Sequence, residues 1–166
     1  MIIDLTQSPH NLLQEQQLGK PFGVWRILVV CQLLNRTHGR QVRPMIEELW
    51  SNCPGPWAMM HADPWHLKSM LKPLGFAEQR FRNVRAMSEQ YAEMLRADPQ
   101  FWRGYENGDW CMSLVGCGTY ARDSLNLVVY GVLDAPTTDH WLERYRKWKL
   151  ERRDLIQRGL AAPVRT

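Results

Sequence analysis

Two glycines with one residue between them, Gly116 and Gly118, constrain this chain most, because an apolar segment precedes them and a helical pattern follows them. Glycine lets the backbone turn tightly and approach a bound group closely. A helix that begins after such a turn, here from Tyr120 onward, presents free N–H groups and the positive end of its dipole. Residues 114–118, the glycine hairpin, are therefore predicted to bind an anion such as a phosphate. A glycine pair of this kind is also typical of an ordinary turn.

A carboxylate, Asp139, follows Gly118 by 21 residues and stands where another helical pattern begins. Aspartate is a common helix cap, and this is its simplest role here. A carboxylate beside a sugar can instead stabilise the positive charge that develops when a glycosidic bond breaks, and it can orient the attacking water. If Asp139 acts in that way, Thr138 is left to cap the helix. The residues alone leave both roles open.

Helical patterns fill most of the chain. Ser8-Pro9 and Asp63-Pro64 each combine a capping side chain with a proline in the first turn, which marks the start of a helix. Apolar side chains recur at helical spacing in the segments that follow and in several others. We expect helices over residues 10–18, 22–35, 43–53, 65–71, 77–97, 120–130 and 139–157. No credible strand pair is present, so the sequence predicts an all-α fold.

The longest of these patterns, residues 77–97, carries three arginines away from its apolar side: Arg80, Arg82 and Arg85. Such a face can be solvated or can lie along a phosphate backbone. We expect it to be exposed to solvent.

The bulk composition fits a single domain over residues 1–166, with a frayed tail at about residues 158–166. Hydrophobic residues make up 45% of the chain, which is enough for a substantial core. The formal net charge is +4 and the pI is about 9.0, a balance that suits nucleic-acid binding and is also common among enzymes. No apolar run approaches the roughly 18 residues of a membrane span, and we expect neither a secretory signal nor a membrane partner.

The four cysteines, at positions 31, 53, 111 and 117, have spacings that fit neither a zinc motif nor an iron–sulfur site. We expect free thiols in a reducing cytoplasm, and no metal or organic cofactor.

The order of helix, glycine hairpin, helix, loop and aspartate resembles the helix-hairpin-helix DNA glycosylases. Five pieces of the chain, within about residues 8–150, are similar in the same order to the thymine glycosylase domain of the methyl-CpG-binding mismatch glycosylases. They are residues 11–15 (NLLQE), 33–37 (LLNRT), 71–75 (LKPLG), 116–124, and the pattern Asp139-His140-x-Leu142-x-x-Tyr145. The resemblance implies a two-lobed, all-α fold without an iron–sulfur cluster, with the active site in the cleft between the lobes.

The resemblance also implies a reaction. Asp139 and Tyr120 would be catalytic. Tyr120 with Gln14 would also contact the flipped pyrimidine, whose edge an amide can meet with both a donor and an acceptor. Bifunctional members of the superfamily have a lysine at the position of Tyr120, which attacks the sugar as a Schiff-base nucleophile. Tyrosine cannot form an imine, so we expect a monofunctional enzyme that leaves an intact abasic site. Its substrate would be thymine, uracil or a 5-substituted uracil opposite guanine in double-stranded DNA, and the protein would act as a monomer.

Further residues match the parts of the family that hold distorted DNA. Arg36 matches the plug that fills the hole left by the flipped base. Leu74 and Phe76, which we expect at the exposed tip of a turn, match the apolar wedge. Gly116, Gly118 and Thr119 would hold a phosphate near the lesion. Hairpin carbonyls in this superfamily often bind a monovalent cation, which is a further expectation for residues 114–118.

The chain departs from the family at Trp141, where the resembled enzymes have a lysine, and at Cys117 within the hairpin. Trp141 bears on which base is accepted more than on the type of reaction. Two other classes of function stay open. One is an enzyme that modifies a flipped thymine derivative without breaking the sugar bond. The other is a non-catalytic DNA-binding module in which Asp139 is dispensable.

Overall fold

The computed structural model describes residues 12–13, 16 and 22–159, and within these ranges it contains helices and no strand. The α-helices are α2 (Gly23–Leu34), α3 (Gly39–Val42), α4 (Ile46–Asn52), α5 (Pro56–His61), α6 (Pro64–Leu71), α7 (Ala77–Ala97), α8 (Thr119–Leu125) and α9 (His140–Gln157). The short 3-10 turns are η1 (Arg43–Met45), η2 (Lys72–Leu74), η3 (Phe101–Gly104) and η4 (Asp109–Ser113), while η5 (Asn126–Tyr130) is a π-helical turn that continues α8. The all-α prediction is confirmed for these residues, and the finer helix-hairpin-helix assignment stays a prediction.

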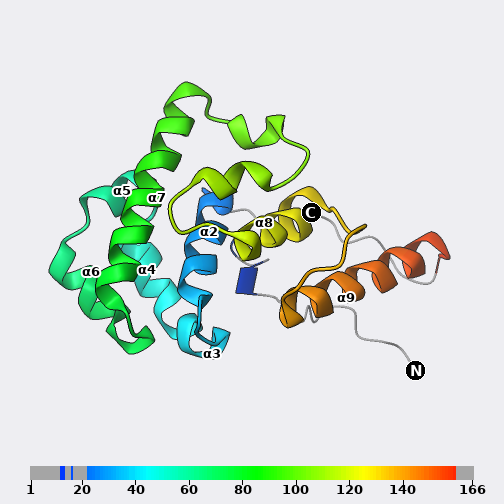
Figure 1. Cartoon of the computed structure of the whole chain (residues 1–166), viewed down its shortest axis with the longest axis horizontal. Helices are drawn as coiled ribbons and strands as arrows, with labels where there is room; N and C mark the ends of the chain where they lie inside the picture. Colours follow the sequence, from blue (N-terminus) through cyan, green and yellow to red (C-terminus); the bar gives the residue numbers. More distant parts are fainter. Residues whose placement is uncertain (1–11, 14–15, 17–21, 160–166) are drawn as a thin grey trace.

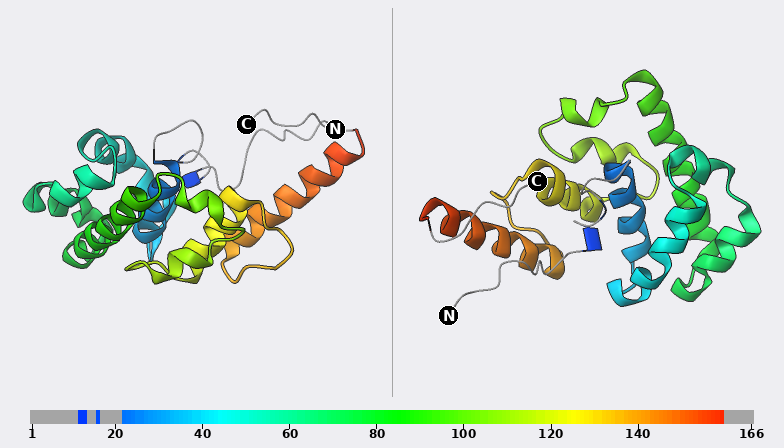
Figure 2. Two further views of the ribbon diagram at one scale, coloured as in Figure 1. Left: turned by 90° about the horizontal axis from the view of Figure 1, so that it is seen from above. Right: turned by 180° about the vertical axis from the view of Figure 1, so that it is seen from behind.

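Helix α2 lies at the centre of the molecule, with α4 to α7 on one side and α8 and α9 on the other (Figures 1 and 2). Its sequence is apolar on every face, which is the pattern of a helix surrounded by other helices. Trp25 and Leu28 are fully buried, and the Trp25 indole donates a hydrogen bond of 2.9 Å to Ser88 on α7. The C-terminal end of α2 therefore emerges between two groups of helices, where the candidate site is found.

Helix α7 covers α2, α5 and α6 and is amphipathic, as its sequence predicts. It buries Phe81, Val84, Met87 and Tyr91, which recur every three or four residues along one face. Full burial of one such side chain contributes about 1.5–3 kcal/mol. This face packs against α2, α5 and α6 and so holds α5 and α6 beside the central helix.

Most predicted helices agree with the structure within a few residues, and that at residues 77–97 has the same bounds as α7. Two short helices, α3 and α5, fall between the predicted ranges, because four and six residues are too few to show a helical repeat of apolar side chains. The predicted helix at residues 10–18 lies mostly outside the described residues, as does most of the predicted tail.

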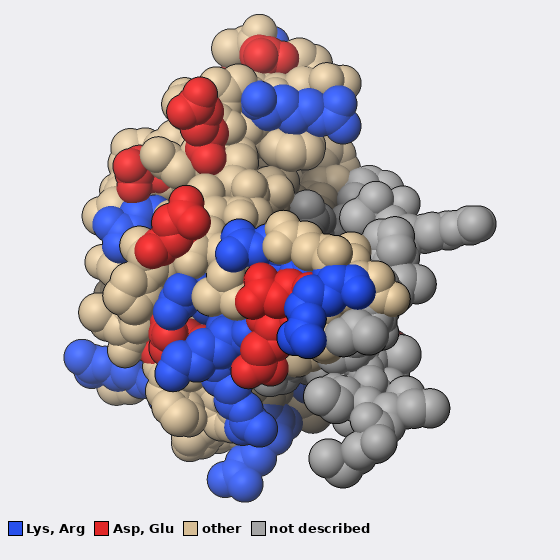
Figure 3. Space-filling view, turned by 90° about the vertical axis from the view of Figure 1, so that its right-hand side faces the viewer, with Lys and Arg blue, Asp and Glu red and all other residues tan. Residues whose placement is uncertain are grey.

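The surface carries charges of both signs. On the side where α9 projects, Lys and Arg side chains gather over the lower half of the view, with Asp and Glu side chains among them (Figure 3). Charge alone therefore does not outline a nucleic-acid footprint on this face. Among the described helices, none is both long and apolar enough to cross a membrane.

Candidate active site beside the glycine hairpin

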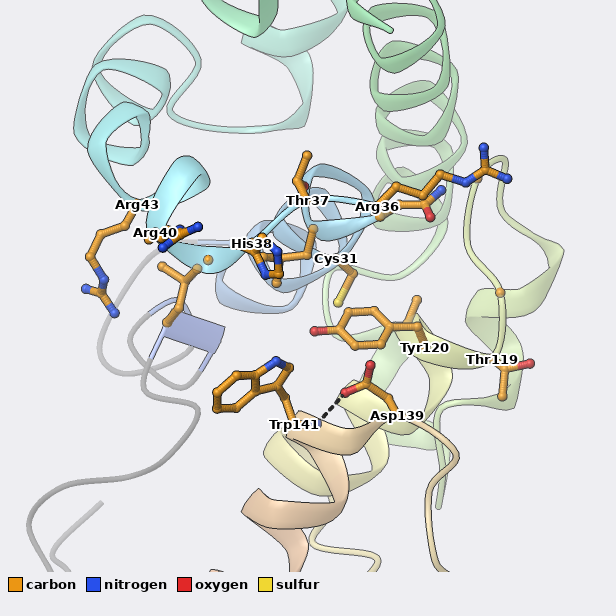
Figure 4. Close-up of a pocket in the computed structure, with 17 residues that line it drawn as sticks. Cys31, Arg36, Thr37, His38, Arg40, Arg43, Thr119, Tyr120, Asp139 and Trp141 are labelled. Atoms are coloured by element: carbon orange, nitrogen blue, oxygen red, sulfur yellow. Dashed lines mark hydrogen bonds between the residues drawn. The ribbon is translucent and has the colours of Figure 1, made fainter. Parts of the chain in front are cut away.

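A pocket of about 1030 Å³ opens between the C-terminal end of α2 and the first turns of α8 and α9 (Figure 4). The residues that line it come from segments far apart in the sequence. They are Leu12, Cys31, Leu34, Asn35, Arg36, Thr37, His38, Gly39, Arg40, Arg43, Gly116, Gly118, Thr119, Tyr120, Ala121, Asp139 and Trp141. Among the described residues of this lining, Asp139 is the acidic one, and Arg36, Arg40 and Arg43 are the arginines.

Asp139 both caps α9 and lines the pocket. Its Oδ1 atom accepts hydrogen bonds of 2.9 Å from the backbone N–H groups of Trp141 and Leu142. The expectation that Thr138 would cap this helix is therefore wrong, and Asp139 fills that role. Figure 4 shows the Asp139 carboxylate beneath the ring of Tyr120, inside the pocket. The two roles left open by the sequence are compatible, because capping uses one oxygen of the carboxylate.

Glu143, which the sequence analysis did not predict as a site residue, fixes the loop before Asp139 to α9. Glu143 accepts a hydrogen bond of 3.1 Å from the Thr137 backbone N–H, and it pairs with Arg146 through two bonds of 2.7 and 2.8 Å. Arg146 also donates to the Leu133 carbonyl at 2.9 Å. The paired guanidinium, together with the Thr137 N–H, lowers the pKa of Glu143 to about 2. These contacts tie both ends of residues 133–139 to one helix and restrict where Asp139 can lie.

Tyr120 lies in the first turn of α8, and its ring projects into the pocket (Figure 4). Burial raises the pKa of its phenol well above the usual value, and the nearby Cys31 and Asp139 raise it further. Burial likewise raises the pKa of the Cys31 thiol. At neutral pH both groups therefore keep their protons, so the Tyr120 phenol is uncharged and Cys31 is not a thiolate nucleophile.

Two glutamine side chains from different helices hydrogen-bond to the backbone of the glycine hairpin. Gln32 on α2 donates to the Val115 carbonyl at 3.0 Å, and Gln90 on α7 accepts from the Val115 N–H at 2.8 Å. Gly116 has a φ of 73°, and a methyl group there would come within 2.9 Å of the Gln32 side chain. Gly118 has nothing within 4 Å of a methyl group, so its side faces open space. The two glycines therefore have different tasks: Gly116 makes the turn against α2, and Gly118 keeps the surface open to an approaching group.

Two carbonyls of the glycine hairpin already accept hydrogen bonds. The Val115 carbonyl accepts from Gln32, and that of Leu114 accepts from the Cys117 N–H at 3.1 Å. A cation at the hairpin would have to share these two carbonyls with their hydrogen-bond donors. The predicted cation stays an expectation.

Arg36 and Phe76 flank a second, smaller groove of about 240 Å³ beside the pocket. Both residues have left-handed backbones, with φ of 58° and 52°, which is uncommon for residues other than glycine. Phe76 is 70% exposed, whereas Leu74 is 5% exposed and packs in the core. The expectation that both lie exposed at the tip of the turn is wrong for Leu74, because η2 folds its side chain inward and the chain then reverses at Gly75. Gln14, the other predicted base contact, lies outside the described residues.

Arg80 corrects a second expectation. It is 7% exposed rather than solvated, while the Arg82 side chain is 65% exposed. The Arg80 guanidinium donates to carbonyls at the end of α2 and in the turn before α7. These are the carbonyls of Gln32 (2.9 Å), Leu33 (3.2 Å), Asn35 (2.9 Å), Leu74 (3.3 Å) and Gly75 (2.8 Å). Arg80 therefore caps α2 and links the segments that carry Arg36 and Phe76.

The four cysteines are buried free thiols, and no group of three or more His, Cys, Asp or Glu side chains in the described part of the chain could hold a metal ion.

The structure thus defines an all-α protein in which a helix-capping carboxylate and a protonated phenol share a pocket beside a glycine hairpin. No protein-family model matches the chain. It is similar to the methyl-CpG-binding domain protein 4-like protein of Arabidopsis thaliana, with 31% identity over 140 residues, which cover 84% of this chain and 28% of the relative.

Two archaeal proteins are similar over shorter stretches. The thymine/uracil-DNA glycosylase of Pyrobaculum aerophilum is 27% identical over 64% of this chain and 44% of its own length. The thymine-DNA glycosylase of Aeropyrum pernix is 35% identical over 36% of this chain and 27% of its own. The chain thus spans less than half the length of each of these relatives. The resemblance to the thymine glycosylases of the helix-hairpin-helix superfamily is confirmed.

Proposed function

We propose that this protein is a monofunctional DNA glycosylase that releases thymine, uracil or a 5-substituted uracil lying opposite guanine. The observation that carries the proposal is the position of Asp139, whose carboxylate is fixed at the start of α9 and lines a pocket with Tyr120. The similarity to thymine- and uracil-DNA glycosylases supports the same substrate class.

The chemistry follows from these two side chains. As the bond between base and sugar breaks, positive charge develops on the deoxyribose, and the Asp139 carboxylate stabilises that charge and orients the attacking water. Tyr120 carries no amine, so it forms no imine with the sugar, and the product is an intact abasic site. Its O–H group, held protonated by burial, donates to an acceptor on the extruded pyrimidine.

The surroundings of the pocket support DNA as the partner. The target base must leave the stack to reach Asp139, at a cost that is smallest for a mismatched base. Arg36 borders both the pocket and the adjoining groove, where it can fill the space that the base vacates. Phe76, which is exposed and lines that groove, can act as the wedge. Gly118 and Thr119 at the pocket rim can receive a backbone phosphate.

The test is mass spectrometry of duplexes that carry G·T, G·U, G·5-hydroxymethyluracil or A·T, incubated with the purified protein. Free thymine or uracil from the mismatches, and little from A·T, is the expected result. A base that is altered but still attached to the strand would instead indicate a base-modifying enzyme. Binding without any release, at equal strength on matched and mismatched DNA, would indicate a non-catalytic module.

A further inference from the structure

Trp141 presents its indole to the same pocket as Asp139. It lies in the first turn of α9, and its backbone N–H donates to Asp139 Oδ1 at 2.9 Å. Its side chain is 50% exposed although it lines the pocket, and Figure 4 shows the indole projecting into the cavity on the same side as Asp139. The Trp141 indole therefore exposes a large aromatic surface to solvent in the pocket, two residues along the chain from the candidate carboxylate of Asp139.

The indole is supported by its own helix. The Arg144 guanidinium lies 5.8 Å from the centre of the Trp141 ring, and the His140 ring meets it edge-on at 5.6 Å. A tryptophan held in this way loses little side-chain entropy when a flat ligand covers it, and covering it removes apolar surface from water. Trp65 on α6 is more exposed, at 76%, but it borders neither of the two hollows described above.

We propose that Trp141 is the surface on which the extruded pyrimidine stacks, so that Trp141 contacts the face of the base while Tyr120 contacts its edge. The inference rests on the proposed function, since it concerns the same pocket. Stacking on an aromatic ring tolerates different bases, because every base offers a flat π-face. A cavity of about 1030 Å³ also leaves room around a single pyrimidine ring. The site therefore accepts uracils with different uncharged groups at C5, including 5-hydroxymethyluracil, and Trp141 contributes a similar amount to the binding affinity of each.

The experiment measures binding in the Asp139→Asn background, so that it does not depend on turnover. The probes are duplexes with uracil, thymine, 5-hydroxymethyluracil or a tetrahydrofuran abasic analogue opposite guanine. Four proteins are compared: the Asp139→Asn parent and its combinations with Trp141→Ala, Trp141→Phe and, as a matched control, Trp65→Ala. Thermal unfolding of each verifies that it folds.

Trp141→Ala is expected to weaken binding of every base-containing duplex by between about 5-fold and about 150-fold, and to leave the abasic duplex nearly unchanged. Trp141→Phe should recover most of the loss, and Trp65→Ala should resemble the parent. An equal loss on the base-containing and abasic duplexes would overturn the proposal, because Trp141 would then support the fold or contact the DNA backbone. A loss confined to one of the three bases would overturn the stacking mode.

This test and the test of the proposed function can fail separately. A wild-type protein that releases no base would contradict glycosylase activity, whereas the binding comparison would still report whether Trp141 contacts an extruded base. Conversely, a wild type that releases base, together with a Trp141→Ala variant that binds all duplexes like its parent, would refute the stacking contact alone.

Discussion

Asp139 Oδ1 accepts a hydrogen bond of 2.9 Å from the backbone N–H of Leu142, so the carboxylate at the pocket is also the cap that starts α9. The candidate catalytic group is therefore positioned by main-chain geometry, which does not rearrange as a flexible side chain would. Because one residue serves both purposes, substitutions at Asp139 can separate chemistry from folding.

Asp139→Asn should retain the fold and lose the chemistry. Asparagine caps helices about as well as aspartate, so the free energy of unfolding should stay within about 0.5 kcal/mol of wild type, while base release falls at least about 100-fold. Asp139→Ala should lose both base release and about 1 kcal/mol of stability. Chemical denaturation and single-turnover base release measure the two effects.

Asp63→Ala is the matched control for the cap. Asp63 caps α6 by accepting from the His66 N–H at 2.6 Å, away from the pocket. This variant should lose a similar amount of stability and retain base release. If Asp139→Asn released base at the wild-type rate, Asp139 would be a cap and nothing more.

The two hairpin glycines should respond differently to alanine. Gly116→Ala places a side chain at a φ of 73° and within 2.9 Å of Gln32, so we expect it to destabilise the protein by about 1–2 kcal/mol. Gly118→Ala meets no neighbouring atom and should leave stability nearly unchanged, yet it should weaken DNA binding if a phosphate approaches there. Melting curves and filter binding distinguish the two effects, and equal destabilisation by both variants would contradict the assignment.

Arg80→Met should be strongly destabilising, by about 3 kcal/mol, because it removes a buried guanidinium and leaves several carbonyls without their donor. Arg82→Met, two residues further along the same helix and on its exposed side, is the control and should change stability by less than about 0.5 kcal/mol. Urea denaturation at pH 7 measures both. A small effect at Arg80 would mean that water replaces its hydrogen bonds.

Acid should release the loop that carries Asp139. The pKa of Glu143 is about 2 in the folded protein, below the value of 4.5 for a free glutamate, because Arg146 and the Thr137 N–H favour its charged form. A lowered pKa contributes stability that is complete above about pH 4.5 and is lost as the pH falls toward 2.

Glu143→Gln should therefore reduce the free energy of unfolding by about 1 kcal/mol at pH 7, since the pair lies near solvent, and by much less near pH 2. Urea denaturation across this range provides the comparison. A deficit that does not depend on pH would point to lost packing instead of the ion pair.

The helices could be predicted because their signals are local. A proline after a capping side chain marks the start of α6, and the spacing of Phe81, Val84, Met87 and Tyr91 marks the buried face of α7. The hairpin and Asp139 could be linked because their order along the chain resembles a known family. These features depend on neighbours in sequence.

The missed features depend on neighbours in space. Arg80 was assigned to a solvated face because its partners are carbonyls at the end of α2, about 45 residues earlier in the chain. Leu74 was assigned to an exposed tip because one residue of difference in a turn decides which side chain faces the core. The hydrogen bonds of Gln32 and Gln90 to Val115 join three segments that are far apart in the chain. No motif in any one of these segments predicts them.

The most direct test of the central claim uses end-labelled duplexes with T or U opposite G, incubated with the protein and analysed with and without alkali. We predict strand cuts at the mismatched pyrimidine only after alkali, since a monofunctional glycosylase leaves an abasic site with an unbroken backbone. Asp139→Asn should produce no cuts in either lane. Cuts without alkali would contradict the role given to Tyr120, and no cuts after alkali by the wild type would contradict the proposed activity itself.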